Sequence, residues 1–403
     1  MTDFRLDSPL AFDPTDLERA DDPYALLASV RAGGPLRKLA SGYWAVTGHA
    51  AALEVLRHPR CGSSPIALRY LDGLPPGAAR DEMSHRINFL DPPDHPRVRG
   101  IVAKAFTPRR IAALRPWIER TAEALLDDLR DDAGEVDLLA RYAHQLPSLV
   151  ISELLGVPTA DRDRLTGWSD AVAPLLGVHV PPAVKQRAVA AAEDFHAYLG
   201  TLLEERRRAP GDDLLSALLL AEEDGQRLAH VELLSLAATL YSAGHRTTRD
   251  LFANGLSVLL RTPGALARVA SGEWPAASVV EEFLRYETPT LFVARVPLQP
   301  VEIAGVPVGA FEPVLVFLAA ANRDPAAHDA PDEFRPGRSG PGSLSFAFGA
   351  HFCLGASLAR SEAEVMLGAF ARRHAHAALA RPLRWHQRGP FRGLDELVVR
   401  LAG

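Results

Sequence analysis

The chain has 403 residues, 47% of them hydrophobic and 23% charged, and a formal net charge of −6. This composition is typical of globular proteins and excludes collagen-like, coiled-coil and disordered classes. Basic residues number 44 against 50 acidic ones and form no stripe along the chain, so no nucleic-acid partner is expected.

Cysteine content and hydropathy indicate the cellular compartment of the protein. The two cysteines, Cys61 and Cys353, are far apart in the sequence, which excludes a disulfide-stapled secreted fold. The polar start of the chain lacks the layout of a signal peptide, and no apolar run approaches the roughly 18 residues that cross a bilayer. We therefore expect a cytoplasmic protein with no membrane association.

Apolar periodicity predicts a mainly helical protein with a minor β component. Three central segments carry apolar residues at three- and four-residue spacing, as amphipathic helices do. Short β-branched runs around Gly305 predict strands joined by a tight turn, and a long segment rich in Pro and Gly predicts a functional loop. In chain order the predicted elements are a strand at 43–47, helices at 118–129, 189–208 and 231–260, strands at 301–303 and 306–308, the loop at 322–342 and a helix at about 354–374.

A cysteine lies where a glycine-bearing loop is predicted to enter a helix, in the segment 346–355. A helix N-terminus offers unpaired N–H groups and a positive dipole end, which favour a thiolate. Gly349 and Gly355 would let the backbone approach a flat ligand closely. A single thiolate with no second ligand at zinc spacing suits an axial bond to heme iron. Taken alone, Cys353 would be better explained as a buried apolar residue, but the surrounding residues reverse that preference.

This segment resembles the heme-binding motif of cytochrome P-450, the family of heme-thiolate monooxygenases, and of its bacterial members in particular. The residues that meet the motif are Phe346, Gly349, His351, Cys353 and Gly355. Ala347 departs from it, because many members carry a further glycine there. The resemblance implies that Cys353 is the metal ligand and that the cofactor is heme b (iron protoporphyrin IX). It also implies a triangular, mainly α fold with small β-sheets (α+β), in which residues 1–403 form a single domain enclosing the heme.

A pair of opposite charges precedes the cysteine motif. Glu282 and Arg285 lie three apart on a predicted helix and, taken alone, would be a surface ion pair of little energetic weight. Their position in the sequence, ahead of Cys353, resembles that of the structural Glu–Arg pair of the family. By that resemblance, Arg338 is the third partner.

Cations at fixed spacing predict a site for the heme propionates. His95 and Arg99 lie four apart, on one face of a helix that begins near a cluster of prolines. Such cations pair with carboxylates through charge-assisted hydrogen bonds. The resemblance assigns this role to His95 and Arg99, together with Arg295 and His351 from elsewhere in the chain.

The middle of the predicted helix at 231–260 carries a stripe of small residues that ends in a hydroxyl. A glycine inside a helix costs about 1 kcal/mol relative to alanine. Close approach of a ligand, a local widening of the helix, or a simple helix crossing would each account for it. By resemblance this is the distal oxygen-binding groove, with Thr247 as the alcohol that delivers protons. The stripe consists of Leu240, Ala243, Gly244 and Thr247.

Arg246 stands where most family members carry Glu or Asp. The change reverses the charge and removes a proton-relay carboxylate. Three interpretations follow: protons arrive by water and Thr247 alone, Arg246 turns outward into a salt bridge, or Arg246 binds an anionic group. Some heme-thiolate peroxygenases place an arginine here for a fatty-acid carboxylate, but they lack the following threonine.

The predicted function is a monooxygenase that inserts one oxygen atom from O2 into a hydrophobic or aromatic small molecule of secondary metabolism. Electrons would come from NAD(P)H through an external ferredoxin and ferredoxin reductase, because the chain has no dinucleotide-binding fingerprint. Arg109, Arg110 and Arg360 are candidates for docking an acidic donor. The alternatives are a peroxide-driven peroxygenase, an aromatic-coupling oxidase and a catalytically silent heme-binding module.

The substrate pocket is placed by family position, and its apolar segments indicate a hydrophobic substrate, either free or bound to a carrier protein. The protein is expected to be a monomer. The pocket residues are Ile66, Leu176, Val178, Leu240, Ala243, Thr290, Phe292 and Phe391.

Overall fold

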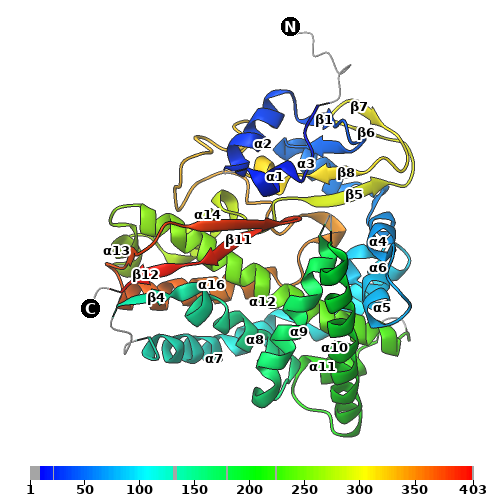
Figure 1. The fold of residues 1–403 in the computed structure, drawn as a ribbon, viewed down its shortest axis with the longest axis horizontal. Coiled ribbons are helices and arrows are strands. Elements are labelled where there is room, and N and C mark those ends of the chain that lie inside the picture. The colour runs from blue at the N-terminus through cyan, green and yellow to red at the C-terminus, as the bar shows by residue number, and fades with distance from the viewer. Residues whose placement is uncertain (1–9, 21, 130–133, 178–179, 223–224, 402–403) are drawn as a thin grey trace.

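The computed structural model describes residues 10–20, 22–129, 134–177, 180–222 and 225–401. A smaller β-rich part, built from both the N-terminal segment and residues near 300, lies beside a larger helical body (Figure 1). The mainly helical fold with small sheets is the predicted class. Within the described part of the chain, no helix combines the length and apolar character needed to span a membrane.

The β-rich part is a five-stranded sheet with apolar residues buried on both faces. The strand order is β1-β2-β8-β5-β3, with β2 and β8 parallel and the other pairs antiparallel. Trp44 and Val46 of β2 face the cluster formed with α3, whereas Ala45 faces the cluster formed with α1 and α2. The elements are α1 (Asp16–Arg19), α2 (Pro23–Ala32), β1 (Leu36–Lys38), β2 (Trp44–Val46), α3 (His49–Arg57), β3 (Cys61–Gly62), β5 (Val293–Pro297), β8 (Val314–Val316) and α15 (Leu318–Ala321).

The short strands predicted from sequence are present. β2 lies within the predicted strand at 43–47, and the hairpin β6 (Val301–Ile303) and β7 (Val306–Val308) has the predicted bounds. Gly305 adopts a φ of 75° in its turn, a conformation that favours glycine. Sequence periodicity is therefore sufficient for these strands.

The helical body surrounds the long helix α12 (His230–Arg261), which crosses the centre of the molecule (Figure 1). It packs against α5, α8, α14 and α16. The other helices of the body are α4 (Ser64–Leu71), α5 (Ala78–His85), α6 (Asp94–Ala105), α7 (Pro108–Asp127), α8 (Gln145–Leu155), α9 (Arg162–Val172), α10 (Pro182–Arg208), α11 (Leu214–Leu220), α13 (Ala265–Ala270), α14 (Ala276–Tyr286) and α16 (Ala356–Arg373).

Short turns and two further sheets complete the body. Single 3₁₀ turns occupy Ile87–Phe89, Thr159–Asp161, Ala173–Leu176 and Gly349–His351, and a π-helical turn occupies Leu139–Ala143. The sheet β4-β12-β9 and the hairpin β10-β11 lie near the C-terminus of the described chain. These strands are β4 (Glu135–Asp137), β9 (Ala378–Leu379), β10 (Arg384–Arg388), β11 (Phe391–Glu396) and β12 (Val398–Arg400).

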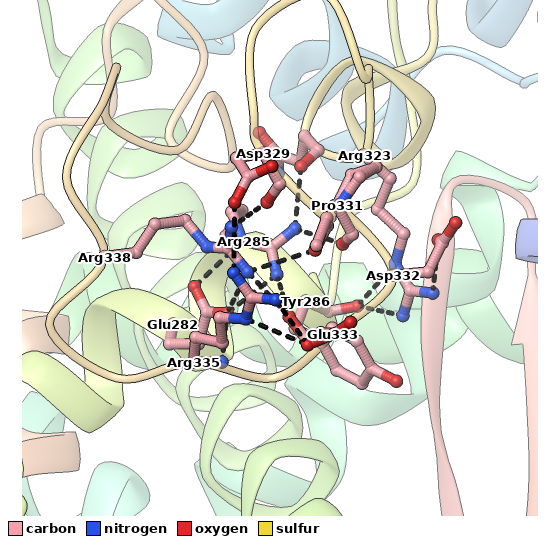
Figure 2. Close-up of polar contacts among 12 residues, drawn as sticks. Glu282, Arg285, Tyr286, Arg323, Asp329, Pro331, Asp332, Glu333, Arg335 and Arg338 are labelled. Carbon is pink, nitrogen blue, oxygen red and sulfur yellow. Dashed lines mark hydrogen bonds and ion pairs between the residues drawn. The ribbon is translucent and has the colours of Figure 1, made fainter.

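Glu282 and Arg285 of α14 form a buried pair, not the surface pair that their spacing alone would suggest. Their side chains are 4% and 3% exposed, and the Arg285 Nη2–Glu282 Oε1 distance is 2.7 Å. Arg285 also donates to the carbonyl groups of Asn322, Pro331 and Glu333 (Figure 2). A buried charge pair needs such additional hydrogen bonds to offset desolvation.

Arg338 joins this group, as the resemblance implied. Its Nη2 lies 3.5 Å from Glu282 Oε1 and donates to the Glu333 carbonyl at 2.8 Å. The backbone N–H of Arg335 donates to the same Glu282 oxygen at 2.7 Å (Figure 2). The predicted loop at 322–342 is therefore fastened to α14, and this fixes the chain that leads on to Cys353.

Candidate functional site

A cavity with a volume of about 310 Å³ lies between α12 and the Cys353 segment. Its wall combines apolar side chains from α8, α9 and α12 with a smaller number of polar groups. Cavities of this kind are the usual sites for cofactors and small molecules. Of the predicted site residues, those that line it are His95, Arg99, Leu176, Leu240, Ala243, Gly244, Arg246, Thr247, Phe346, His351, Cys353, Gly355 and Phe391.

Cys353 precedes α16 and does not lie in its first turn. The helix begins at Ala356 with Gly355 as its N-cap, and the Cys353 N–H donates to the Phe346 carbonyl at 3.0 Å. Burial raises the pKa of the Cys353 thiol, although the Gly355 N–H, Arg99 and Arg360 act in the opposite direction. The backbone N–H at the helix end thus favours the thiolate, as predicted, but burial opposes it and is the larger effect; a bound metal ion would supply the missing positive charge.

The two glycines of the motif serve different purposes. A Cβ at Gly355 would meet no atom within 4 Å, so its side faces open space in the cavity, as expected for ligand approach. Gly349 has a φ of 74°, and a Cβ there would collide with the backbone carbonyl of Leu56. Gly349 is thus required by the close packing of α3, and the expectation that it admits a flat ligand is wrong.

Four predicted cationic residues gather beside the cysteine loop. The imidazole rings of His95 and His351 have centroids 4.1 Å apart, and Arg99 donates to the Phe352 carbonyl at 2.8 Å. Burial, Arg295 and His95 lower the pKa of His351 to about 3. Burial also lowers the pKa of Arg295 to about 10. At neutral pH the His351 ring is therefore neutral, and Arg99 and Arg295 carry the positive charge of this group.

Unsatisfied polar atoms in this group test whether it fits a heme. Within the described chain, His95 Nε2 and His351 Nδ1 are buried and have no hydrogen-bond partner. The neighbouring carboxylate, Asp91, accepts from the N–H groups of Ser63 and Ser64 and from the Ser64 hydroxyl. Buried polar groups normally have partners, and two propionates would supply acceptors here. The residues present fit a heme.

The distal wall is a continuous stretch of α12. The Thr247 hydroxyl donates to the Ala243 carbonyl at 2.8 Å, and the helix is regular through this region, so the alternative of a local widening is not observed. A Cβ at Gly244 would lie 3.0 Å from Ile151 of α8, so the glycine permits a close helix crossing. Gly244 also lines the cavity, so a close helix crossing and the close approach of a ligand can both account for this glycine.

Arg246 forms an ion pair with Asp170 of α9. The distance from Arg246 Nη1 to Asp170 Oδ1 is 3.6 Å, and the Arg246 side chain is 16% exposed. Asp170 also lies 3.4 Å from His245 Nε2. Of the three interpretations of Arg246, this geometry favours the salt bridge, although the side chain remains in the cavity wall.

Three predicted pocket residues pack elsewhere. Phe292 packs against Phe317 with tilted rings, at a centroid distance of 5.4 Å, in the core between α2 and the sheet. Ile66 packs into the cluster formed by α4, α5 and α10, and Thr290 forms a β-bridge with Phe391. These three residues do not line the cavity, because family position does not specify which way each side chain points, and their role in the substrate pocket stays a prediction. Val178 lies outside the described residues.

Sequence patterns did not predict the charged side chains Arg86 and Glu362 of the cavity wall, nor Asp170, which contacts Arg246 without lining the cavity itself. Arg86 pairs with buried Glu82 one helical turn earlier, and Asp170 reaches Arg246 from another helix. Glu362 is 1% exposed, and its Oε2 has no partner within the described chain. The spacing of Leu358, Glu362 and Met366 on one stripe of α16 could have identified the buried acid; no local signal marks Asp170.

Comparisons with known proteins identify the family to which the chain is similar. The family described as cytochrome P-450 matches residues 76–271 and 276–378. Vitamin D(3) 25-hydroxylase of Pseudonocardia autotrophica is 38% identical, over 94% of this chain and 90% of that protein. The monooxygenase PikC of Streptomyces venezuelae is also 38% identical, over 94% of this chain and 91% of that protein. The structure of P450BioI with a fatty-acid-ligated acyl carrier protein superimposes with a TM-score of 0.88, at 32% identity, over 96% and 100% of the two chains.

Proposed function

The chain belongs to the cytochrome P-450 family of heme-thiolate monooxygenases, and from that premise we propose that it oxidises a hydrophobic or aromatic small molecule of secondary metabolism. The observation that carries the proposal is the position of Cys353 and Thr247 on the walls of one largely apolar cavity. When bound there, heme b would supply the activation of dioxygen.

Each part of the cavity wall has a proposed task. The Cys353 sulfur would hold the iron, and His95, Arg99, Arg295 and His351 would hold the propionates. The Thr247 hydroxyl keeps a proton donor at the distal wall, and water replaces the absent acid as the source of protons. Ile151, Val172, Leu176 and Leu240 exclude water from the substrate.

Partners follow from the same premise. We propose that NAD(P)H supplies electrons through a ferredoxin reductase and a ferredoxin, and that residues 1–403 act as one monomeric domain. The carrier-protein complex of the related P450BioI supports a carrier-bound substrate as well as a free one. The ion pair of Arg246 and the presence of Thr247 favour ordinary monooxygenation over the peroxygenase alternative.

Absorption spectroscopy tests the iron ligand. Reduced protein treated with CO is expected to show the red-shifted Soret band of a thiolate-bound heme, and Cys353→Ala is expected to abolish it. Cys61→Ala is the matched control, because Cys61 is the other free cysteine and lies buried on β3. An unchanged band in Cys353→Ala contradicts the assignment.

Turnover separates the reaction classes. Product formation with ferredoxin, reductase and NAD(P)H supports the monooxygenase, whereas activity with peroxide alone on carboxylates supports the peroxygenase. Coupled rings without an added oxygen atom identify the oxidase. If a ligand binds and shifts the spin state of the heme, but no electron source yields a product, the result supports the catalytically silent heme-binding module.

A further inference from the structure

We infer that Asp170 sets the charge preference of the substrate cavity: it neutralises Arg246 so that the cavity takes uncharged molecules, and its removal converts the cavity into a carboxylate-binding site. The inference rests on the proposed function, because it concerns the substrate of that site. It makes Asp170 a specificity-determining residue that acts through Arg246.

Arg246 occupies the junction of two cavities. The outer cavity has a volume of about 170 Å³ and also includes Arg388 and Glu18 in its wall. It shares Ala173, Leu176, Arg246 and Phe391 with the inner cavity. A ligand that extends from the inner cavity into the outer one must therefore pass the Arg246 guanidinium.

Asp170 contacts Arg246 from a separate helix, α9, without lining either cavity itself. Ser169 Oγ donates to Ser242 Oγ at 3.0 Å, and the hydroxyl groups of Thr166 and Tyr241 are 2.9 Å apart, so α9 is fastened to α12 directly N-terminal to the pair on both helices. The hydrogen bond to His245 and the charge of Arg246 lower the pKa of Asp170 to about 2 against the opposing effect of burial. The carboxylate is thus a fixed negative charge beside Arg246.

The remaining charges near the junction have other partners or lie farther out. Arg249 pairs with Asp250 at 2.8 Å, so that carboxylate already has its own cation. Glu18 accepts from the Gly389 N–H at 3.0 Å. Arg388 has no ion-pair partner within the described chain and adds positive charge to the outer cavity. Asp170 is therefore the counter-charge on which the neutrality of Arg246 depends.

The energetic consequence follows from the surroundings. A cation in an apolar, poorly solvated wall attracts an anion strongly unless an opposite charge is already in place. With Asp170 present, a carboxylate ligand must compete with Asp170 for Arg246. Without it, Arg246 and Arg388 would both be available to the acid group of an apolar chain.

The test measures binding to the heme-loaded protein by calorimetry, at fixed salt and a pH at which alkanoates are ionised. The probes are dodecanoate and dodecanamide, which share a chain and differ in charge. Wild type is expected to bind the amide at least as tightly as the acid. Asp170→Asn is expected to bind dodecanoate about tenfold more tightly with the amide unchanged, and a second change, Arg246→Gln, is expected to remove the gain.

Two results overturn the inference. One is an unchanged dodecanoate affinity in a folded Asp170→Asn protein that retains its heme spectrum. The other needs no variant: wild type that prefers the acid to the amide already has an accessible Arg246. Because binding is measured without turnover, failure to oxidise a substrate contradicts the proposed function and leaves these measurements intact.

Discussion

Glu362 and the histidines beside Cys353 are buried polar residues at the same cavity, but their burial has different consequences. His95 and His351 lie beside Arg99 and Arg295, and the propionates of a heme would supply the partners that their ring nitrogens lack. Glu362 has no cation among the causes acting on it, and burial alone raises its pKa well above its ordinary value. A carboxyl group in such a place is neutral when folded.

Stability is therefore expected to depend on pH through Glu362. Above pH 4.5, the ordinary pKa of this group, the unfolded chain releases the proton while the folded chain keeps it. Stability is then lost as pH rises towards the raised pKa of the folded state, at up to about 1.4 kcal/mol per pH unit. Glu362→Gln removes this loss, so the variant should match wild type below pH 4.5 and exceed it increasingly as the pH rises above that value.

Thermal unfolding of both heme-loaded proteins across this range is the measurement. The difference in Tm between variant and wild type should grow with pH. Parallel curves would mean that Glu362 is ionised in the folded protein and has a partner. Glu364→Gln on the same helix is the control, because Glu364 is partly exposed and contacts Arg115.

At the scale of elements, α14 and the loop it fastens are held by charge, and the energetic weight of that charge can be measured. Arg285→Met leaves Glu282 buried without its cation, a change that typically costs about 3–5 kcal/mol. It also removes the donors to three loop carbonyls. We expect a large loss of stability in chemical denaturation and a loss of heme retention, because the same loop leads to Cys353.

Arg335→Met is the matched control for that variant. Its side chain pairs with Asp329 and Glu333 at the surface and is 45% exposed, whereas its backbone N–H, which binds Glu282, is kept. Exposed pairs contribute little, so stability should change little. Equal losses in the two variants would show that burial does not distinguish the two arginines.

Local patterns in the sequence were enough for several of these elements, and contacts between distant segments account for the rest. α12 and the hairpin β6–β7 follow from spacing and Gly305, because each pattern is complete within its own segment. The predicted helices at 118–129 and 189–208 begin earlier, at Pro108 and Pro182, where proline starts a helix without interrupting apolar spacing.

Local sequence patterns likewise predicted only part of the site. Its cysteine motif, His95 and Arg99 were located from sequence, because the spacing that defines them is local. Asp170 and the true reason for Gly349 were not, since each depends on a segment far away in the chain. Spacing specifies which residues share an element; it does not specify what the opposite element presents to them.

At the scale of the whole molecule, one exposed face combines aromatic and cationic groups next to the Cys353 loop. Phe348 and Phe352 are 36% and 37% exposed, and the Arg57 guanidinium lies 4.3 Å from the Phe348 ring centroid. Exposed aromatics with nearby cations are common in protein interfaces. Electrons delivered to this face would have a short path to Cys353, so it is the surface on which we expect the electron donor.

The three arginines predicted to dock the donor are not equivalent. Arg360 pairs with Glu281, and Arg110 lies 3.4 Å from Asp212. Arg109 is exposed at the start of α7 and has no ion-pair partner within the described residues. Since a charge already paired has less to offer an acidic partner, Arg109 should contribute most of the three.

Arg109→Glu is therefore expected to raise the KM for ferredoxin about three- to tenfold while kcat at saturating ferredoxin and substrate affinity stay the same. The loss should shrink as ionic strength rises, because salt screens the exposed charge in wild type as well. Arg384→Glu, on β10, is the control for the charge reversal; since Arg384 is already paired with Glu396, it should leave the KM unchanged. Equal effects of the two reversals would mean that net charge alone steers the donor; a salt-independent loss would mean that Arg109 supports the fold of α7 instead of contacting the partner.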